Sequence, residues 1–414
     1  MGLENNIPEG WVESTLNELA FINPRESIRK GDLAKNVPMD CIDSFTRKIS
    51  RFGIKEFKGG TKFKNKDTLL ARITPCLENG KTALVDILDK DEIGFGSTEY
   101  IVIRENNDKS YFKFLYYLSI SPKFRRNAIK AMTGTSGRQR VQTDVLINKV
   151  FRFPPLPEQK SIAKVLTSFD DKIELLQAQN KTLETMAQTI FKEWFGKYQI
   201  GDELPEGWRV GKLGDIANLK SGYAFKSKEF VEESTKKALK IKDLKGDGKV
   251  SLNAVSCVSN DVTKLSRVQY FRLKEGDIVL AMSGNTTGKI GVIPPHSNEV
   301  YLNQRVGKFF MIKQDLNSFL YSFLMSGNYE EKILSMGYGS AQPNISPSQI
   351  ENIDIIYPNE EKLVSYLNIS NPIFNKVLDN NNQIQSLTKT RDTLLPKLMS
   401  GQVRVNNIKQ TADA

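Results

Sequence analysis

Few residues in this sequence could carry out catalysis. The only histidine, His296, follows two prolines in a segment typical of a surface turn. Hydrolases that use a serine or cysteine nucleophile commonly need a histidine base beside it. The three cysteines, Cys41, Cys76 and Cys257, are far apart, so they form none of the closely spaced pairs that bind zinc. We therefore expect no catalytic residues, no metal site and no cofactor.

Two glycine-lysine pairs resemble part of a phosphate-binding loop. That loop needs a glycine five residues before the glycine-lysine pair and a serine or threonine after it. Before Gly80-Lys81 that position holds Pro75, and the second run, residues 284–289, is one residue too short and is followed by Ile290. Both pairs lie between segments that resemble β-strands. We therefore predict turns between strands at both places.

An enzyme that acts on DNA by itself is not favoured either. The Asn/Asp-Pro-Pro-Tyr/Phe motif of adenine methyltransferases is missing from the sequence. Glu158 and Lys160 could suggest a nuclease carboxylate and lysine. However, Glu158 lies at the expected start of a helix, where a carboxylate interacts favourably with the helix dipole. That structural interpretation is the stronger one.

The charge balance favours a polyanionic partner. Among 414 residues, 59 Lys and Arg exceed 48 Asp and Glu, which gives a net charge of +11. Such a basic balance points first to DNA or RNA, although basic proteins without a nucleic-acid role also exist. No apolar run approaches the ~20 residues of a membrane helix, and residues 1–6 lack a signal pattern. We expect a cytoplasmic protein with no membrane contact, which also suits the scattered cysteines.

The sequence contains an internal repeat. Residues 7–11 read IPEGW and residues 204–208 read LPEGW. Further matches follow in the same order: residues 66–71 with 276–281, Gly80-Lys81 with Gly288-Lys289, and Pro154 with Pro358. An ordered series over the whole chain indicates two copies of one unit.

Each copy begins with a domain of mixed secondary structure. Short runs typical of β-strands are followed by one apolar, aromatic run typical of a helix. In the first copy these are 68–73, 81–87, 99–104 and the helix 111–120, and in the second they are 277–283, 289–293, 305–313 and the helix 316–325. The pattern predicts two α+β domains of about 150 residues, large enough for a core.

A long helix is expected after each domain. From Ile162 to Trp194, apolar residues and Asn180 alternate at spacings of four and three, which is the pattern of a coiled coil. Asn180 either fixes the register of the pairing helix or is a polar slip near a helix end. The second stripe, from Leu363 to Leu398, contains Pro372, where we predict a kink or break. Two such helices in one chain are expected to pair antiparallel, related by an approximate two-fold axis.

The order of these segments resembles a known family. PPLPEQK at 154–160, LPEGW at 204–208 and LLPKLMSG at 394–401 occur where the specificity subunits of Type I restriction-modification systems (HsdS) carry their shared segments. The resemblance implies a non-catalytic subunit with two target-recognition domains and two helices that form an antiparallel coiled coil. It also implies a two-part DNA target whose non-specific spacer is set by the helices. The irregular second stripe with Pro372 departs from this pattern.

On this resemblance we expect five segments. They are a first target-recognition domain at 1–157, a spacer helix at 158–196, a second target-recognition domain at 197–358, a second spacer helix at 359–402 and a flexible tail at 403–414. The implied partners are double-stranded DNA, two methyltransferase (modification) subunits and restriction subunits in the full complex. The alternative is a DNA-binding coiled-coil adaptor with duplicated recognition domains and no methylation partner.

Basic residues in both domains are candidates for DNA contacts. Between residues 45 and 66 they cluster with interleaved phenylalanines, as phosphate neutralisation requires, although a solvated basic loop has the same composition. The candidates are Arg47, Lys48, Arg51, Lys55, Lys58, Lys62, Lys64, Arg138, Arg140, Lys236, Lys237, Lys240, Lys242 and Lys245.

If the two half-sites differ, residues shared by both copies cannot carry the difference. Gln139 and Gln342 occupy matching places, so they suit a shared role. Base-reading residues are expected where the copies diverge, roughly at 31–66 and 226–270. Arg, Lys, Asn and Gln side chains in these segments could pair with base edges in the major groove.

Overall fold

The computed structural model describes residues 7–405, apart from 136, 247, 253–254, 314, 327–328, 330–331, 334–335 and 337–343. Gln342 and residues 406–414, which figured in the sequence-based expectations, lie outside the described residues. The chain forms two compact units. The first consists of residues 1–173 with 387–414, and the second consists of residues 174–386.

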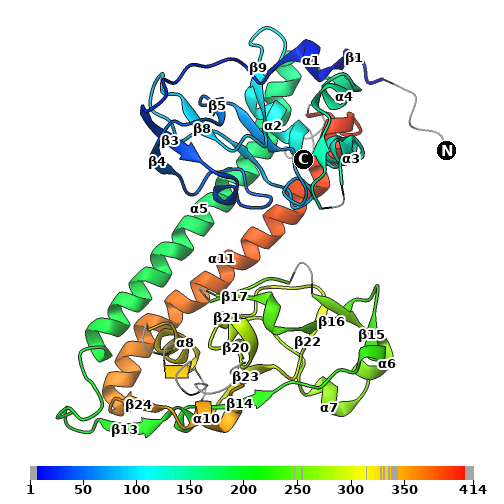
Figure 1. The fold of residues 1–414 in the computed structure, drawn as a ribbon. Coiled ribbons are helices and arrows are strands. Elements are labelled where there is room, and N and C mark those ends of the chain that lie inside the picture. The colour runs from blue at the N-terminus through cyan, green and yellow to red at the C-terminus, as the bar shows by residue number, and fades with distance from the viewer. Residues whose placement is uncertain are drawn as a thin grey trace, which may run out of the picture. The chain divides into compact units, whose positions relative to one another are not determined.

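The first unit contains a mixed domain built on two four-stranded sheets (Figure 1). One sheet has the order β2-β9-β6-β7 and is antiparallel throughout. The other has the order β4-β3-β8-β5, with β3 and β8 parallel. The strands are β2 (Ala20–Ile22), β3 (Leu33–Val37), β4 (Gly53–Glu56), β5 (Thr61–Phe63), β6 (Thr68–Ala71), β7 (Thr82–Leu84), β8 (Gly94–Gly96) and β9 (Tyr100–Glu105).

Short helices and two small ladders complete the first domain. Its remaining elements are α1 (Leu16–Leu19), α2 (Phe112–Ile120), α3 (Pro122–Lys130), α4 (Thr143–Ile147), the 3-10 turn η1 (Met39–Cys41), and the paired strands β1 (Val12–Thr15) with β12 (Val150–Phe153) and β10 (Met132–Thr133) with β11 (Arg140–Val141). The apolar run predicted as a helix is α2, in which Phe114, Tyr116 and Tyr117 are buried in the core. The predicted runs at 68–73 and 81–87 contain β6 and β7, and the run at 99–104 covers β9 except for Glu105, so the mixed α+β class is confirmed.

The second unit repeats this plan with a larger sheet. The order β14-β23-β20-β21 matches β2-β9-β6-β7, and β18 and β17 extend it to six strands. The second sheet, β15-β19-β16-β22, contains the parallel pair β16–β22, which matches β3–β8. The same local sequence signals therefore specify the same sheet centre twice, and the repeat found in the sequence is a structural repeat.

The bounds of the second unit's elements follow chain order. They are β13 (Arg209–Lys212), η2 (Leu213–Asp215), β14 (Ala217–Ser221), η3 (Ser227–Glu229), β15 (Phe230–Val231), β16 (Lys236–Leu239), η4 (Ile241–Asp243), β17 (Leu244–Gly246), β18 (Gly248–Val250), β19 (Ser256–Val258), α6 (Asn260–Thr263), α7 (Ser266–Gln269), β20 (Ile278–Ala281), η5 (Gly284–Thr286), β21 (Ile290–Val292), β22 (Glu299–Leu302), β23 (Val306–Met311), α8 (Asn317–Met325), α10 (Pro347–Glu351) and β24 (Asp354–Tyr357).

Two long helices follow the domains: α5 (Leu156–Phe195) and α11 (Glu360–Ser400) (Figure 1). Within the first unit, Asp170 of α5 accepts a hydrogen bond from Arg391 of α11 at 2.5 Å, and Glu158 accepts one from Arg404 just beyond α11 at 2.7 Å. Within the second unit, Asn180 meets residues 380 and 381, whereas Trp194 contacts Tyr366. As the residue number along α5 rises, the number of the residue that it contacts on or just beyond α11 falls, so the helices pair antiparallel, as predicted.

The polar residue in the first seam is paired with the second helix. Asn180 donates to Oδ1 of Asn381 at 2.9 Å and accepts from Asn380 at 2.8 Å. Asn180 and Asn380 are both buried. A one-turn slip of either helix would leave these amides unpaired in an apolar seam, which is costly. The structure therefore favours the interpretation that Asn180 fixes the register of the two helices over the interpretation as a polar slip near a helix end.

The predicted break at Pro372 is wrong, because α11 continues through it without interruption. Proline removes one amide donor and frees the carbonyl four residues earlier. Pro372 and Asn368 are both exposed, so that carbonyl lies on the face where water can bind it. On the buried face, Ser318 of α8 bonds to Ser370 and Asn371 at 2.7 and 2.6 Å. These contacts hold the helix on the N-terminal side of the proline.

The chain beyond α11 returns to the first domain. Arg404 donates two hydrogen bonds to Glu158 at 2.7 and 2.9 Å, and Val405 is buried in the first core. Residues 403–405, the start of the expected tail, therefore belong to the packed domain. The exposed backbone expected of a tail does not occur there, because burial of Val405 and the ion pair of Arg404 fix this segment.

Candidate nucleic-acid interface

The candidate cations of the first domain fall into two groups. Lys48, Lys55, Lys58 and Arg138 are exposed, and Arg51 is largely exposed although it also donates to the carbonyl of Asp40. Lys55 lies on β4, at one edge of its sheet, and Lys58 follows in the turn that leads to β5. Lys62 lies on β5, with its ammonium 5.1 Å from the ring centre of Phe57. The structure thus presents several of these charges near both edges of one sheet.

The second group forms ion pairs with carboxylates of the first unit, although the side chains of Lys64 and Arg140 remain 42% and 45% exposed. Arg47 donates to Asp171 of α5 at 2.6 Å and its side chain is only 10% exposed. Lys64 pairs with Glu26 at 2.9 Å. Arg140 forms a two-pronged pair with Glu99, with nitrogen–oxygen distances of 2.7 to 3.0 Å. Arg47 is therefore a packing residue that joins the domain to its helix.

The lysines of the second domain are similarly divided. Lys236 pairs with Glu299, and Lys237 lies 3.0 Å from the sulfur of Cys257. Lys242 and Lys245 are exposed, and Lys245 donates to the carbonyl of Lys242 at 3.0 Å.

Lys240 is held differently. Its ammonium lies 3.7 Å from the ring centre of Phe230. Burial, together with the nearby charge of Lys242, lowers the pKa of Lys240 below its ordinary value.

Lys240 and Lys242 line a hollow of about 350 Å³ on the second domain. Its walls also contain Phe225, Phe230, Ile241 and three consecutive polar residues, Asn303, Gln304 and Arg305, between β22 and β23. The lining residues include cations and amides but no carboxylate. Residues 303–305 lie outside the divergent segments, so the sequence-based reasoning missed them. Only the parallel pairing of β16 with β22 brings them beside Lys240.

The glycine-lysine pairs are turns, as predicted. Lys81 accepts a backbone hydrogen bond from Ala71 at 3.1 Å, and Lys289 accepts one from Ala281 at 2.9 Å. Gly80 and Gly288 have φ angles of +72° and +84°, which favour glycine at both closing positions. These turns join β6 to β7 and β20 to β21.

The residues considered for catalysis have structural surroundings. His296 is half-buried rather than fully on the surface, and its Nδ1 lies 2.7 Å from the carbonyl oxygen of Asn298. Glu158 lies in the first turn of α5, as predicted, where it accepts hydrogen bonds from Trp11 and Arg404. Within the described part of the chain, no cluster of potential metal ligands occurs. No helix there is both long and apolar enough to cross a membrane.

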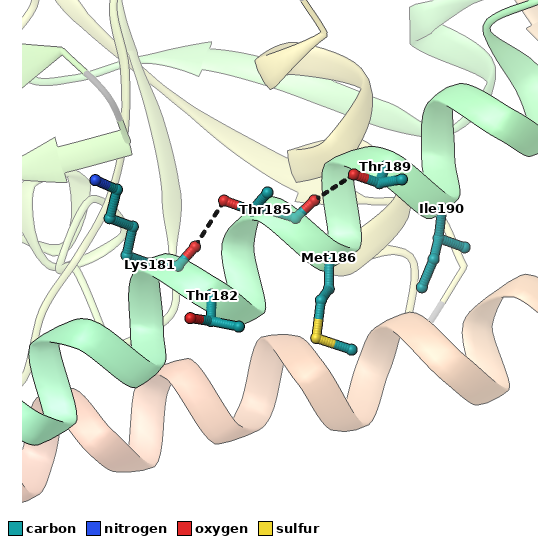
Figure 2. A pocket seen from close by; sticks show the side chains of 6 residues that line it. All are labelled: Lys181, Thr182, Thr185, Met186, Thr189 and Ile190. Carbon is teal, nitrogen blue, oxygen red and sulfur yellow. Dashed lines mark hydrogen bonds between the residues drawn. The ribbon is translucent and has the colours of Figure 1, made fainter.

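A second, shallower groove of about 420 Å³ lies along α5 (Figure 2). It is lined by Lys181, Thr182, Thr185, Met186, Thr189 and Ile190. The hydroxyls of Thr185 and Thr189 donate to carbonyls one turn earlier, at 2.8 and 2.9 Å. Because those hydroxyls are satisfied within the helix, the groove presents mainly methyl groups and the Met186 side chain.

Comparison with known proteins agrees with this architecture. A family model described as the Type I restriction modification DNA specificity domain matches residues 8–185 and 205–389. The MjaVIII specificity subunit of Methanocaldococcus jannaschii, a Type I restriction enzyme subunit, is 31% identical over 306 residues, covering 70% of this chain and 71% of that subunit. The EcoAI specificity subunit of Escherichia coli is 28% identical over 442 residues, covering 83% and 74%.

A solved structure shares the fold. The S subunit of a Type I restriction-modification system from M. genitalium matches with a TM-score of 0.57 and 19% sequence identity, over 96% of this chain and 98% of that one. The family model matches both copies of the sequence repeat. In the structure, each copy corresponds to one domain followed by one long helix. The chain therefore belongs to the family of Type I restriction-modification specificity subunits, which are non-catalytic DNA-recognition subunits.

Proposed function

We propose that this chain gives a Type I restriction-modification complex a two-part DNA target. Each domain would read one half-site, and the DNA between them would be a spacer of fixed length and no defined sequence. The observation that carries the proposal is the duplication itself, in which one sheet framework occurs twice with different surface residues. Two copies of one framework suit two similar but non-identical half-sites on the same duplex.

The proposed division of labour follows the expected segments. Residues 1–157 and 197–358 would be the target-recognition domains, and 158–196 and 359–402 the spacer helices. Family relationship and the antiparallel contacts of α5 with α11 support this division. The paired helices would set the length of the spacer between half-sites.

The proposed partners are two modification subunits, which methylate adenine, and restriction subunits in the full complex. Relatives of this chain are named as specificity subunits of Type I restriction enzymes, which supports such an assembly. The chain would act where the host DNA lies, in the cytoplasm. The adaptor without a methylation partner is not favoured, because no relative named here is of that kind.

Phosphate contacts are proposed for the exposed cations. These are Lys48, Arg51, Lys55, Lys58 and Arg138 in the first domain, and Lys242 and Lys245 in the second; the half-buried Lys62 on β5 is proposed with them. Lys64, Arg140, Lys236, Lys237 and Lys240 would bind DNA only by exchanging or sharing their present partners. Arg47 is not proposed as a phosphate contact, because its guanidinium forms an ion pair with Asp171 and its side chain is only 10% exposed.

Adenine methylation mapped across the host genome, with and without this gene, tests the proposal. Loss of one methylated two-part motif on deletion is the expected result, and it would reveal both half-sites and the spacer. An unchanged methylation pattern in a host that expresses the complex would contradict it. Replacing residues 44–66 should then alter one half-site alone, and a change in both would contradict the assignment of one domain to one half-site.

A further inference from the structure

The strands and turn that frame the hollow on the second domain have structural counterparts in the first domain. The parallel pair β16–β22 ends at Leu239 and Leu302, and β3–β8 ends at Val37 and Gly96. A 3-10 turn follows β16 and β3 alike, closed by a hydrogen bond from Asp243 to Lys240 in one and from Cys41 to Pro38 in the other, at 2.9 and 3.0 Å. Lys240 and Lys242 therefore stand where the first domain has Pro38 and Asp40.

The other wall of the hollow is equivalent as well. Arg305 accepts a backbone hydrogen bond from Met282 at 3.0 Å, and Glu99 accepts one from Arg72 at 2.9 Å. Both bonds follow the strand pairings β20–β23 and β6–β9, which have the same register. Asn303, Gln304 and Arg305 thus stand where the first domain has Ser97, Thr98 and Glu99.

The same place in the shared framework carries opposite charge in the two domains. The second domain has three cations there, Lys240, Lys242 and Arg305, whereas the first has two carboxylates, Asp40 and Glu99. A site for the DNA backbone alone would have no reason to differ, because phosphates are the same in both half-sites. Divergence at a conserved place of the fold is what discrimination between different base sequences requires.

Two of the polar side chains in the second-domain hollow are available to a ligand, whereas that of Asn303 is buried. Gln304 and Arg305 are exposed, and their side chains have no hydrogen bond or ion pair among the described residues. The rings of Phe225 and Phe230 form apolar walls beside Lys240. In the first domain, by contrast, Glu99 is already held by Arg140.

We infer that Gln304 and Arg305, with Lys240 and Lys242 beside them, form a base-reading site of the second domain that binds the edges of purine bases. Arginine pairs in two-pronged fashion with O6 and N7 of guanine, and asparagine or glutamine pairs with N6 and N7 of adenine. The lysines supply charge for the flanking phosphates. This inference rests on the proposed function and names residues of the second domain that determine its half-site.

The test compares single variants of this site in the complete complex. Gln304→Ala and Arg305→Ala are suitable because exposed side chains can be truncated with little effect on stability. Lys220→Ala is the matched control, since Lys220 is an exposed cation of the same domain that lies outside both the hollow and the divergent segment 226–270. Arg305→Lys keeps the charge and loses the two-pronged geometry. Methylated motifs are read by genome-wide mapping, and thermal unfolding checks each complex.

Each site variant is expected to relax one base position in one half-site, with roughly 10- to 100-fold less discrimination there. Arg305→Lys should relax the same position as Arg305→Ala, and Lys220→Ala should leave the motif unchanged. The inference is overturned if both half-sites keep their sequence, whether methylation stays complete or falls uniformly at all sites. It is also overturned if both half-sites change. Failure of the proposed function is distinct, because the unmodified gene would then yield no two-part motif.

Discussion

Buried charges tie the first domain to its helices. Asp170 of α5 is buried, and it accepts hydrogen bonds from Arg391 of α11 and from the hydroxyl of Tyr117 on α2, at 2.5 and 2.6 Å. Burial, and then the charge of Asp170, raise the pKa of Tyr117, so its hydroxyl keeps its proton. One carboxylate thus joins three helices of the unit.

Removing the cation of this cluster should destabilise the first unit. Arg391→Met leaves the buried carboxylate of Asp170 without a counter-charge, which costs about 3 to 5 kcal/mol. We expect the thermal midpoint of the first unit to fall by roughly 6 to 20 °C. The control is Lys389→Met, because Lys389 is exposed two residues away. Calorimetry of the full chain checks this, and equal midpoints for the two variants would contradict the role of Asp170.

Acid should weaken the first unit through Glu26. Its side chain is 8% exposed; burial acts to raise its pKa, but hydrogen bonds from Lys64 and Arg104 outweigh burial and hold the pKa below the ordinary value of 4.5. A lowered folded-state pKa gives stability that is present above the unfolded pKa and lost as pH falls through the folded one.

Glu26→Gln should therefore lower the thermal midpoint of the first unit at pH 7. The difference from the unmodified chain should shrink as the pH falls below about 4.5. Thermal unfolding measured across this pH range tests the expectation. A difference that stays constant with pH would show that Glu26 acts through packing alone.

At the scale of single elements, α11 tolerates an interior proline at a cost. Pro372→Ala restores one backbone hydrogen bond on the exposed face of the helix, where no packed neighbour must move. We expect a gain of about 1 to 3 kcal/mol in the stability of the second unit. Asn368→Ala, at an exposed position one turn earlier, should change stability by no more than about 0.5 kcal/mol. Urea unfolding distinguishes the two, and a loss of stability in Pro372→Ala would be the contrary result.

At the scale of the whole molecule, the paired helices are proposed to set the spacer. Lengthening both helices by insertion tests this proposal, provided that Asn180 still faces Asn380 and Trp194 still faces Tyr366. One heptad added after Glu184 in α5 and one before Lys376 in α11 meets both conditions. Seven helical residues add about 10 Å, which corresponds to about three base pairs.

The double insertion should lengthen the spacer of the methylated motif by about three base pairs and leave both half-sites unchanged. The control is a heptad inserted in α5 alone. This insertion places either Asn180 or Trp194 opposite the wrong residue of α11, so it should abolish methylation. An unchanged spacer in the double insertion would contradict the proposal. Genome-wide methylation mapping is applied to the unmodified chain, the double insertion and the single insertion.

The amino-acid sequence alone was enough to recognise the repeat, the strands at the centre of each domain, the two long helices and the family. These features depend on local periodicity, turn residues and order along the chain, all of which can be read without knowing contacts. It also indicated the clusters of basic residues. It could not tell Lys58, whose side chain is 78% exposed, from Arg47, whose side chain is 10% exposed against Asp171, because Asp171 is distant in sequence.

How distant segments combine became evident only from the folded chain. Pro372 does not break α11, because residues 318 and 370–371 bond across the fold and the freed carbonyl lies on the exposed face. The partners of Asn180 lie in the other long helix, beyond the reach of any local pattern. The hollow exists because a parallel strand pair brings residues 240–242 beside 303–305. Strand pairing over such sequence distances is fixed by packing of the whole domain, so sequence pattern alone could not reveal the hollow.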